Sequence, residues 1–179
     1  MMINDIVIKK ADPIHIDELE LLYDELNDYF TSTVNYPGWI KHIYPTRETA
    51  INGIKEKSLF VAQINDTIVG SIILNHIPEE AYDKAKWIIA TDYKDVLVIR
   101  TLVVHPLYLN KGIATTLLQF TKQYALNHQN KSIRLDVSEN NLPAVALYKK
   151  MGYKYIDTVD LGLPYEHLKW FQLYELSLV

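Results

Sequence analysis

The chain of 179 residues has the length of one domain, and its 49% hydrophobic and 22% charged residues are ordinary for a globular protein. A net charge of −4 argues against a nucleic-acid partner bound by bulk electrostatics, and the lack of cysteine excludes disulfides and thiolate zinc sites. The N-terminal residues lack the apolar core of a signal peptide, and no run approaches the roughly 18–20 apolar residues of a membrane span. We therefore expect a cytoplasmic protein with no membrane partner and no metal site.

The N-terminal part of the chain predicts a short strand followed by an amphipathic helix. Residues 3–9 alternate in polarity as in a strand. Asp12 and Pro13 are typical of a helix start, because Asp is a good N-cap and Pro fits the first helical position. One apolar stripe then continues to about residue 30. It consists of Leu19, Leu22, Tyr23, Leu26 and Phe30.

A loop rich in aromatic residues follows over 31–45, with Pro37 and Gly38 as a turn signal. Its aromatic side chains either line a pocket or cover the core, and the sequence leaves both readings open. Thr46 is the predicted N-cap of a helix that ends near Lys57.

Residues 59–64 and 68–75 predict a β-hairpin, with Asn65 and Asp66 as its turn. Gly70 inside the second strand indicates a bulge or a close approach of another backbone. Residues 78–95 are polar and irregular, and we expect a short helix around 81–88.

Residues 96–104 form an apolar run that Pro106 ends, and an amphipathic helix begins at Gly112. Such a strand–loop–helix unit presents unpaired N–H groups at the start of the helix, which suits phosphate or pyrophosphate, and Lys111 adds a positive charge. A dinucleotide loop and a Walker A loop are both excluded, since Gly112 is the only glycine there. The alternative is a plain unit whose glycine serves close packing.

The last part of the chain predicts a strand, a helix and two strands. The strand covers 132–137, where Ile133 and Arg134 begin an alternation of apolar and polar residues. Asn141 is the predicted cap of the helix and Gly152 its C-terminal stop. The two closing strands cover about 154–161 and 170–178.

Two segments carry a resemblance to a known family. The segment VLVIRTLVVHPLYLNKGIATTLL resembles motif A of the GNAT superfamily, whose Q/R-x-x-G-x-G/A loop holds the pyrophosphate of coenzyme A. Gly112 and Ala114 match that loop, whereas Leu109 departs from it, because the superfamily usually has Arg or Gln there. The second segment is similar to motif B, N-x-x-A-x-x-L-Y-x-x-x-G-F/Y. Its matches are Asn141, Ala144, Leu147, Tyr148, Gly152 and Tyr153.

The resemblance implies an α/β (α+β) fold in a single domain over 1–179. We expect a mixed, mostly antiparallel sheet of about seven strands, flanked by about four helices. Its fourth and fifth strands would be parallel and splayed apart, joined by the helix from Gly112. The segment 78–95 would be an insertion between the third and fourth strands.

The same resemblance implies an N-acetyltransferase that uses acetyl-CoA as acyl donor and a primary amine of a small molecule or a protein as acceptor. The amine would attack directly within a ternary complex, and dimers are common in the superfamily, so a homodimer is one expected assembly. Two alternatives stay open, namely a non-catalytic acyl-CoA-binding sensor and a generic α/β interaction domain. The expected cofactor-binding residues are Leu102, Val103, Val104, Leu109, Asn110, Lys111, Gly112, Ile113, Ala114, Thr115, Asn141 and Ala144.

The resemblance makes Tyr148 the general acid that protonates the leaving sulfur. The general base is open, because the position where some relatives carry glutamate is Val98 here. His76 and Glu79 are the candidates, along with Glu80 and Asp136. The amine would enter near the first helix and the aromatic loop. The candidate substrate-binding residues are Tyr29, Phe30, Tyr36, Trp39 and Arg100, although Arg100 could instead form a local ion pair.

Overall fold

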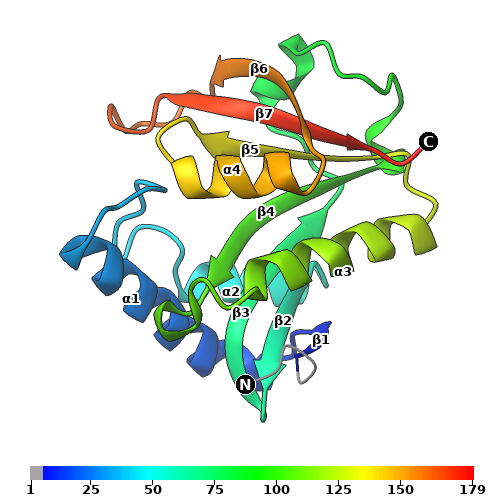
Figure 1. Ribbon diagram of the computed structural model, residues 1–179. Helices are drawn as coiled ribbons and strands as arrows, with labels where there is room; N and C mark the ends of the chain where they lie inside the picture. Colours follow the sequence, from blue (N-terminus) through cyan, green and yellow to red (C-terminus); the bar gives the residue numbers. More distant parts are fainter. Residues whose placement is uncertain (1–5) are drawn as a thin grey trace. The chain divides into compact units, whose positions relative to one another are not determined.

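The computed structural model describes residues 6–179, so the beginning of the strand predicted at 3–9 lies outside the described residues. Figure 1 shows the elements in chain order. The α-helices are α1 (Ile16–Ser32), α2 (Arg47–Lys55), α3 (Ile113–Asn127) and α4 (Leu142–Lys150). The strands are β1 (Val7–Lys10), β2 (Leu59–Ile64), β3 (Thr67–Asn75), β4 (Val96–Val104), β5 (Ser132–Ser138), β6 (Lys154–Asp160) and β7 (Trp170–Ser177).

The strands form one seven-stranded sheet in the order β1-β2-β3-β4-β5-β7-β6. The pairs β1–β2, β2–β3, β5–β7 and β6–β7 are antiparallel, whereas β4 and β5 are parallel. The mixed, mostly antiparallel sheet is therefore confirmed. None of the helices formed by residues 6–179 is both long and apolar enough to cross a membrane.

The parallel pairing of β4 with β5 covers the first three residues of each strand. The partners are Val96 with Ser132, Leu97 with Ile133 and Val98 with Arg134. Both strands continue past the last of these pairs, β4 to Val104 and β5 to Ser138. The predicted splay of the fourth and fifth strands is confirmed by this short ladder.

The described chain divides into two compact units. The first holds residues up to Asn35, Trp39–Leu74 and Arg100–Phe120, and the second holds Tyr36–Gly38, Asn75–Ile99 and Thr121–Val179. β4 and α3 each contribute residues to both units. The single domain over 1–179 stays a prediction.

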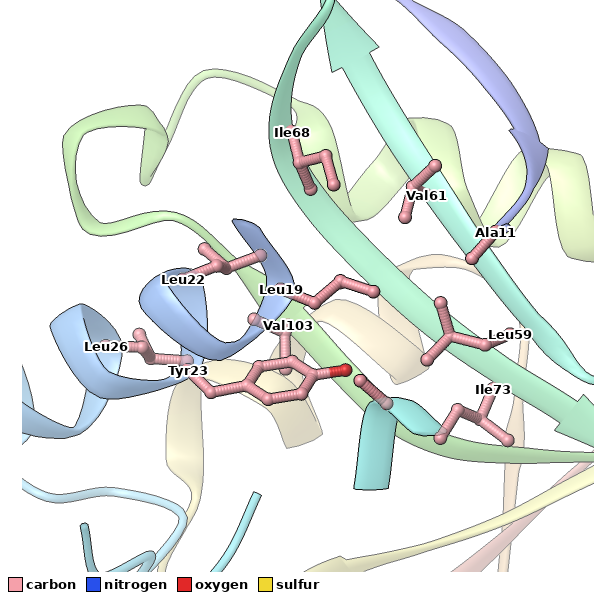
Figure 2. Packing of buried hydrophobic residues seen from close by; sticks show 11 residues of the cluster. Ala11, Leu19, Leu22, Tyr23, Leu26, Leu59, Val61, Ile68, Ile73 and Val103 are labelled. Carbon is pink, nitrogen blue, oxygen red and sulfur yellow. The ribbon is translucent and has the colours of Figure 1, made fainter. Parts of the chain in front are cut away.

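The core of the first unit is built on the predicted apolar stripe of α1. Leu19, Leu22, Tyr23 and Leu26 are all buried, and the partly buried Phe30 packs against the same cluster. Figure 2 shows the side chain of Val103, from β4, among those of α1. Full burial of each such side chain contributes about 1.5–3 kcal/mol, so the stripe attaches α1 to the sheet.

Both N-terminal helices begin where the sequence predicts. A 3₁₀ turn at Pro13–His15 precedes α1, and its start is closed by a hydrogen bond of 2.8 Å from the Asp12 backbone N–H to His15 Nδ1. Thr46 starts α2, with its backbone N–H donating to Thr49 Oγ1 at 3.0 Å. In each case a side chain three residues along satisfies a backbone donor that the helix cannot satisfy.

Gly70 lies in β3 where two predicted features coincide. The register of β2 and β3 shifts between Ala62 and Gln63, so the expected bulge is present and its extra residue lies on β3, next to Gly70. A Cβ atom at Gly70 would lie 2.8 Å from the carbonyl oxygen of Val103 and 3.0 Å from Cγ2 of Ile113. Glycine is therefore required here by the close approach of β4 and α3.

We expect Gly70→Ala to lower the free energy of unfolding by about 1–3 kcal/mol, because the added methyl group meets a backbone oxygen that cannot rotate away. Urea-induced unfolding followed by circular dichroism measures the loss as a lower midpoint at unchanged slope. An unchanged midpoint would mean that β4 shifts away from β3 without cost.

The segment 78–95 differs from its prediction. It forms 3₁₀ turns at Glu80–Lys84 and Tyr93–Asp95 in place of a helix over 81–88. The backbone N–H groups of Ile88 and Ile89 donate to the carboxylate of Glu175 at 2.6 and 3.3 Å. Because these two N–H groups bond a side chain of β7, they cannot donate to the backbone carbonyl groups of an α-helix.

Candidate functional site

We call the loop from β4 to α3, together with the first turn of α3, the cradle; it lies in the first unit. Asn110 and Gly112 have positive φ angles of 60° and 82°, which turn the chain sharply into the helix. The first hydrogen bond along α3 is donated by Thr116 N to Gly112 O at 2.9 Å. The N–H groups of the three preceding residues thus lie in the first turn, where a helix has no carbonyl to receive them. Those residues are Ile113, Ala114 and Thr115.

Charge at the cradle comes from the helix and from Lys111. The ammonium group of Lys111 lies 5.0 Å from the centre of the Tyr108 ring, and the residue is exposed. Leu109 offers no polar side chain, so an anion here would be held by backbone N–H groups, the helix dipole and Lys111. This donor set fits the pyrophosphate of coenzyme A.

The part of β4 that belongs to the first unit has two different faces. Val103 is buried in the core, whereas Leu102 and Val104 are half-buried on the opposite face, as the alternation of a strand requires. Arg100 is half-buried as well. Thr101 interrupts the extended conformation with a positive φ of 45°.

His105 connects the end of β4 to α1. Its Nδ1 accepts a hydrogen bond of 3.1 Å from Leu107 N, so the proton lies on Nε2, which is 2.8 Å from the Glu25 carboxylate. Both ring nitrogens are thereby engaged within the protein. These contacts fix the His105 ring between the end of β4 and α1.

A row of aromatic rings links the C-terminal part of α1 to the loop after it. Tyr29 and Phe30 have ring centres 5.9 Å apart, Phe30 and Trp39 6.5 Å, and Trp39 and Tyr44 5.6 Å. Tyr29 and Tyr44 are exposed at the two ends of the row, and the others are half-buried. The inner rings, Phe30 and Trp39, thus cover the core, which is one of the two readings of the loop, whereas the outer rings face solvent.

In the second unit, α4 presents Tyr148 from a buried position. Its ring centre lies 5.7 Å from that of Tyr153 and 6.5 Å from that of Tyr174. Burial, followed by the negative charge of Asp136, raises the pKa of the Tyr148 phenol above its ordinary value. The phenol is consequently protonated throughout the neutral range.

Asn141 and Ala144 meet at the start of α4. Asn141 Oδ1 accepts a hydrogen bond of 3.4 Å from Ala144 N, which confirms the predicted cap. Because the carbonyl oxygen of the side chain is used in this way, its amide group is the part of Asn141 that suits a ligand carbonyl.

The candidate bases also lie in the second unit. His76 is exposed, and its Nδ1 lies 2.6 Å from Val96 O and 3.2 Å from Tyr93 O. Two carbonyl oxygens at one nitrogen require a proton on Nδ1, which leaves Nε2 to accept a proton in the neutral ring. Glu79 is half-buried, and its backbone carbonyl accepts from Tyr82 N at 3.0 Å.

Two further positions bear on the choice of base. Asp136 accepts a hydrogen bond of 2.6 Å from the Tyr82 hydroxyl, which ties up one carboxylate oxygen. Val98 is fully buried.

Among residues 6–179, no group of three or more His, Asp or Glu side chains is arranged to hold a metal ion.

The structure divides the predicted site residues between the units. The first unit contains the cradle, and it also contains three of the aromatic candidates, Tyr29, Phe30 and Trp39, whose rings lie next to one another. The fourth, Tyr36, is half-buried in the second unit, where the neighbouring Gly38 O lies 3.0 Å from His167 Nε2.

Sequence reasoning missed the pair formed by Tyr44 and Thr101. Tyr44 is visible as one of the loop aromatics, but nothing in the sequence indicates that its hydroxyl contacts the Thr101 hydroxyl on β4. The positive φ of Thr101 is equally hidden, because threonine is a common strand residue.

Comparisons with known proteins found one family model and several relatives. A family model described as the acetyltransferase (GNAT) family matches residues 19–153. The chain is 31% identical over 99 residues to a streptothricin acetyltransferase of Escherichia coli, covering 55% of this chain and 48% of that protein. It is 34% identical over 107 residues to an N-alpha-acetyltransferase of Saccharolobus solfataricus, covering 58% and 62%. The chain thus spans less than two thirds of the length of both relatives.

Solved structures share the fold over nearly the whole chain. A GNAT-family acetyltransferase from Streptococcus agalactiae superposes with a TM-score of 0.79 at 22% identity, covering 96% of this chain and 95% of the other. The Salmonella typhimurium protein yncA, solved with its cofactor acetyl-CoA, gives a TM-score of 0.70 at 14% identity, covering 98% and 95%. Likeness at such low identity establishes the fold alone.

Proposed function

The chain belongs to the acetyltransferase (GNAT) family, and we propose that it is an N-acetyltransferase that transfers an acetyl group to a primary amine by direct attack in a ternary complex. The family uses acetyl-CoA as acyl donor. The observation that carries the proposal is the cradle at the start of α3, where two residues of positive φ turn the chain at Asn110 and Gly112. Such a cradle suits a pyrophosphate far better than it suits a protein partner.

In this proposal, the cofactor is bound mainly by backbone groups. When bound, acetyl-CoA supplies the acetyl group as a thioester. The N–H groups of the cradle donate hydrogen bonds to the pyrophosphate, and the backbone of Leu102–Val104 pairs with the amides of the pantetheine arm. The N–H groups of this stretch are also suited to stabilise negative charge on the thioester oxygen. The proposed binding residues are Leu102, Val103, Val104, Leu109, Asn110, Lys111, Gly112, Ile113, Ala114, Thr115, Asn141 and Ala144.

Two proton movements complete the reaction. The acceptor amine must lose a proton to attack, since an alkylammonium has a pKa of about 10. We propose His76 through Nε2, or Glu79, as the group that takes this proton, directly or through water. The hydroxyl of Tyr148 then donates its proton to the leaving sulfur, a role that its raised pKa permits because the phenol remains protonated.

The acceptor is proposed to bind along the aromatic row. Tyr29, Phe30 and Trp39 of this row would contact its apolar parts. Tyr36, which is not part of the row, and Arg100 are proposed as further contacts, with Arg100 binding an acidic group where the acceptor carries one. Of the two relatives, one is named a streptothricin acetyltransferase and the other an N-alpha-acetyltransferase. Both acceptor classes are therefore carried forward.

Thiol release tests the proposal directly. The purified protein is mixed with acetyl-CoA and a panel of amines that includes streptothricin and short peptides with free N-termini. We expect binding of acetyl-CoA by calorimetry and free thiol with at least one amine. Absence of binding would contradict both the cradle and the enzyme.

A non-catalytic acyl-CoA sensor is the second candidate, because Leu109 replaces the usual polar residue and Val98 replaces the glutamate of some relatives. This reading predicts acetyl-CoA binding without thiol release for every amine. Under this reading, Tyr148→Phe should leave acetyl-CoA binding unchanged and thiol release absent. Under the enzyme reading, the same substitution should lower the rate of thiol release.

A further inference from the structure

Thr101 adopts a backbone conformation that its side chain disfavours. Its φ of 45° lies in the left-handed region, where a β-branched residue is a genuine outlier. It is also the only residue of β4 with a positive φ. Some contact must stabilise this conformation, since the isolated chain would relax toward an extended strand.

Tyr44 supplies that contact. Its hydroxyl bonds the hydroxyl of Thr101, and Tyr44 is itself held from two sides. Its backbone carbonyl accepts a hydrogen bond of 3.3 Å from Asn27 Nδ2 on α1, and its ring packs edge-on against Trp39 with 5.6 Å between centres. Asn27 is fully buried, so this anchor belongs to the core. The Tyr44 hydroxyl is thereby a fixed point for the Thr101 side chain.

The torsion angles of Thr101 set the direction of the next peptide group, which carries the Leu102 N–H. On its far side the strand is fixed, because Val103 O lies against Gly70 of β3 and His105 N donates to Val69 O at 2.9 Å. A change at Thr101 would therefore turn the Leu102 N–H and leave the end of β4 in place.

We propose that Tyr44 is a positioning residue, which holds Thr101 in its left-handed conformation and so aims the Leu102 N–H at the thioester oxygen. This inference rests on the proposed acetyl transfer. Tyr44 is the last ring of the aromatic row. Its hydrogen bond to the Thr101 hydroxyl therefore also links the loop over 31–45, where the acceptor is proposed to bind, to β4. The residue acts through Thr101 and transfers no proton.

The first test is Tyr44→Phe, which keeps the ring on Trp39 and removes the hydroxyl. Removing an oxyanion donor outright costs about 10²–10³ in kcat. A donor that is misaimed but still present should cost less, so we expect a loss of about tenfold in kcat, or about 1.4 kcal/mol. The Kd for acetyl-CoA should stay within about twofold, because the cradle is untouched. Tyr155→Phe is the matched control, since it removes a tyrosine hydroxyl from a tyrosine–threonine pair of 2.8 Å on β6.

The decisive test is a double-mutant cycle with Thr101→Gly. Glycine adopts a positive φ without strain, so in this background the Tyr44 hydroxyl has nothing to hold, and adding Tyr44→Phe should leave kcat unchanged. An equal loss in both backgrounds would overturn the proposal, because Tyr44 would then act independently of Thr101. If Thr101→Gly does not fold, Thr101→Val replaces it, and Tyr44→Phe should add no further loss to that variant.

The outcomes separate this inference from the function on which it rests. A wild-type protein that binds no acetyl-CoA and releases no thiol contradicts the proposed function. An active wild-type protein with an equally active Tyr44→Phe variant contradicts the positioning role alone.

Discussion

Replacing Glu175 by alanine is expected to lower the free energy of unfolding by about 3–5 kcal/mol, the usual cost of removing one partner of a buried ion pair. Glu175 on β7 is fully buried, and its carboxylate lies 2.9 Å from Nε of Arg134 on β5, whose side chain is only 3% exposed. The substitution leaves the guanidinium buried without its counter-charge. It also removes the acceptor of the Ser132 hydroxyl, which lies at 2.5 Å.

The loss of local stability should be largest in the segment 78–95. Glu175 accepts from the backbone of Ile88 and Ile89, and Arg134 donates to Ile89 O at 2.6 Å. The guanidinium also lies 4.4 Å from the ring centre of Trp87 and 5.1 Å from that of Tyr93. One ion pair thus anchors residues 87–89 and 93 of this segment to β5 and β7.

Urea-induced unfolding measures the total cost, and hydrogen exchange shows where it falls. Lys131→Met is the matched control, because it breaks an exposed ion pair of 2.8 Å with Asp95 and should not change the midpoint measurably. The double variant Arg134→Met/Glu175→Leu should lose less than the sum of the single losses, since it leaves no unpaired charge. A Glu175→Ala protein with the wild-type midpoint would show that water satisfies these groups at no cost.

This pair also shows where sequence reasoning stops. The alternation at Ile133 and Arg134 identified β5 correctly, because the period of a strand is local. The sequence could not predict that the segment 78–95 covers the polar side of β5, because this segment carries no periodic pattern. The helix expected over 81–88 was wrong for the same reason, because Glu175 takes the backbone donors from 87 and 86 residues away along the chain.

The elements around the cradle were easier to predict. The apolar run that ends before Pro106 and the glycine at 112 are local signals, and β4 and α3 have the expected extents. The contact between Tyr44 and Thr101 joins residues 57 positions apart and depends on a backbone angle that no residue type at 101 announces. Local patterns therefore predicted the strand, loop and helix start that are proposed to hold the cofactor, whereas the contact between Tyr44 and Thr101 became visible only in three dimensions.

Tyr148→Phe is expected to lower kcat by about 100-fold, at the lower end of the range for a general acid or base. The phenol of Tyr148 is protonated at neutral pH because burial and the charge of Asp136 raise its pKa. It can therefore donate a proton to the leaving sulfur, which phenylalanine cannot do. The Kd for acetyl-CoA should change by less than about twofold, because the ring and its packing are retained.

Tyr153→Phe is a close control for this variant. Tyr153 is equally buried, its ring centre lies 5.7 Å from that of Tyr148, and its hydroxyl has no hydrogen-bond partner among the described residues. Burial raises its pKa as well. Removing this hydroxyl should leave kcat within about twofold, since only the hydroxyl of Tyr148 is proposed to reach the sulfur. Equal losses in both variants would indicate a packing effect and contradict the acid role.

The pH dependence gives a second reading of the same step. The rate with an alkylamine should rise with pH toward the amine pKa of about 10, as the neutral, attacking form becomes populated. A general acid whose pKa is raised above that of free tyrosine loses its proton only at still higher pH, so no alkaline fall should appear below about pH 10. Tyr148→Phe should keep the rising limb at a lower rate. An alkaline fall near pH 8 in the wild type would assign the acid to a different group, because a Tyr148 phenol with a raised pKa cannot ionise there.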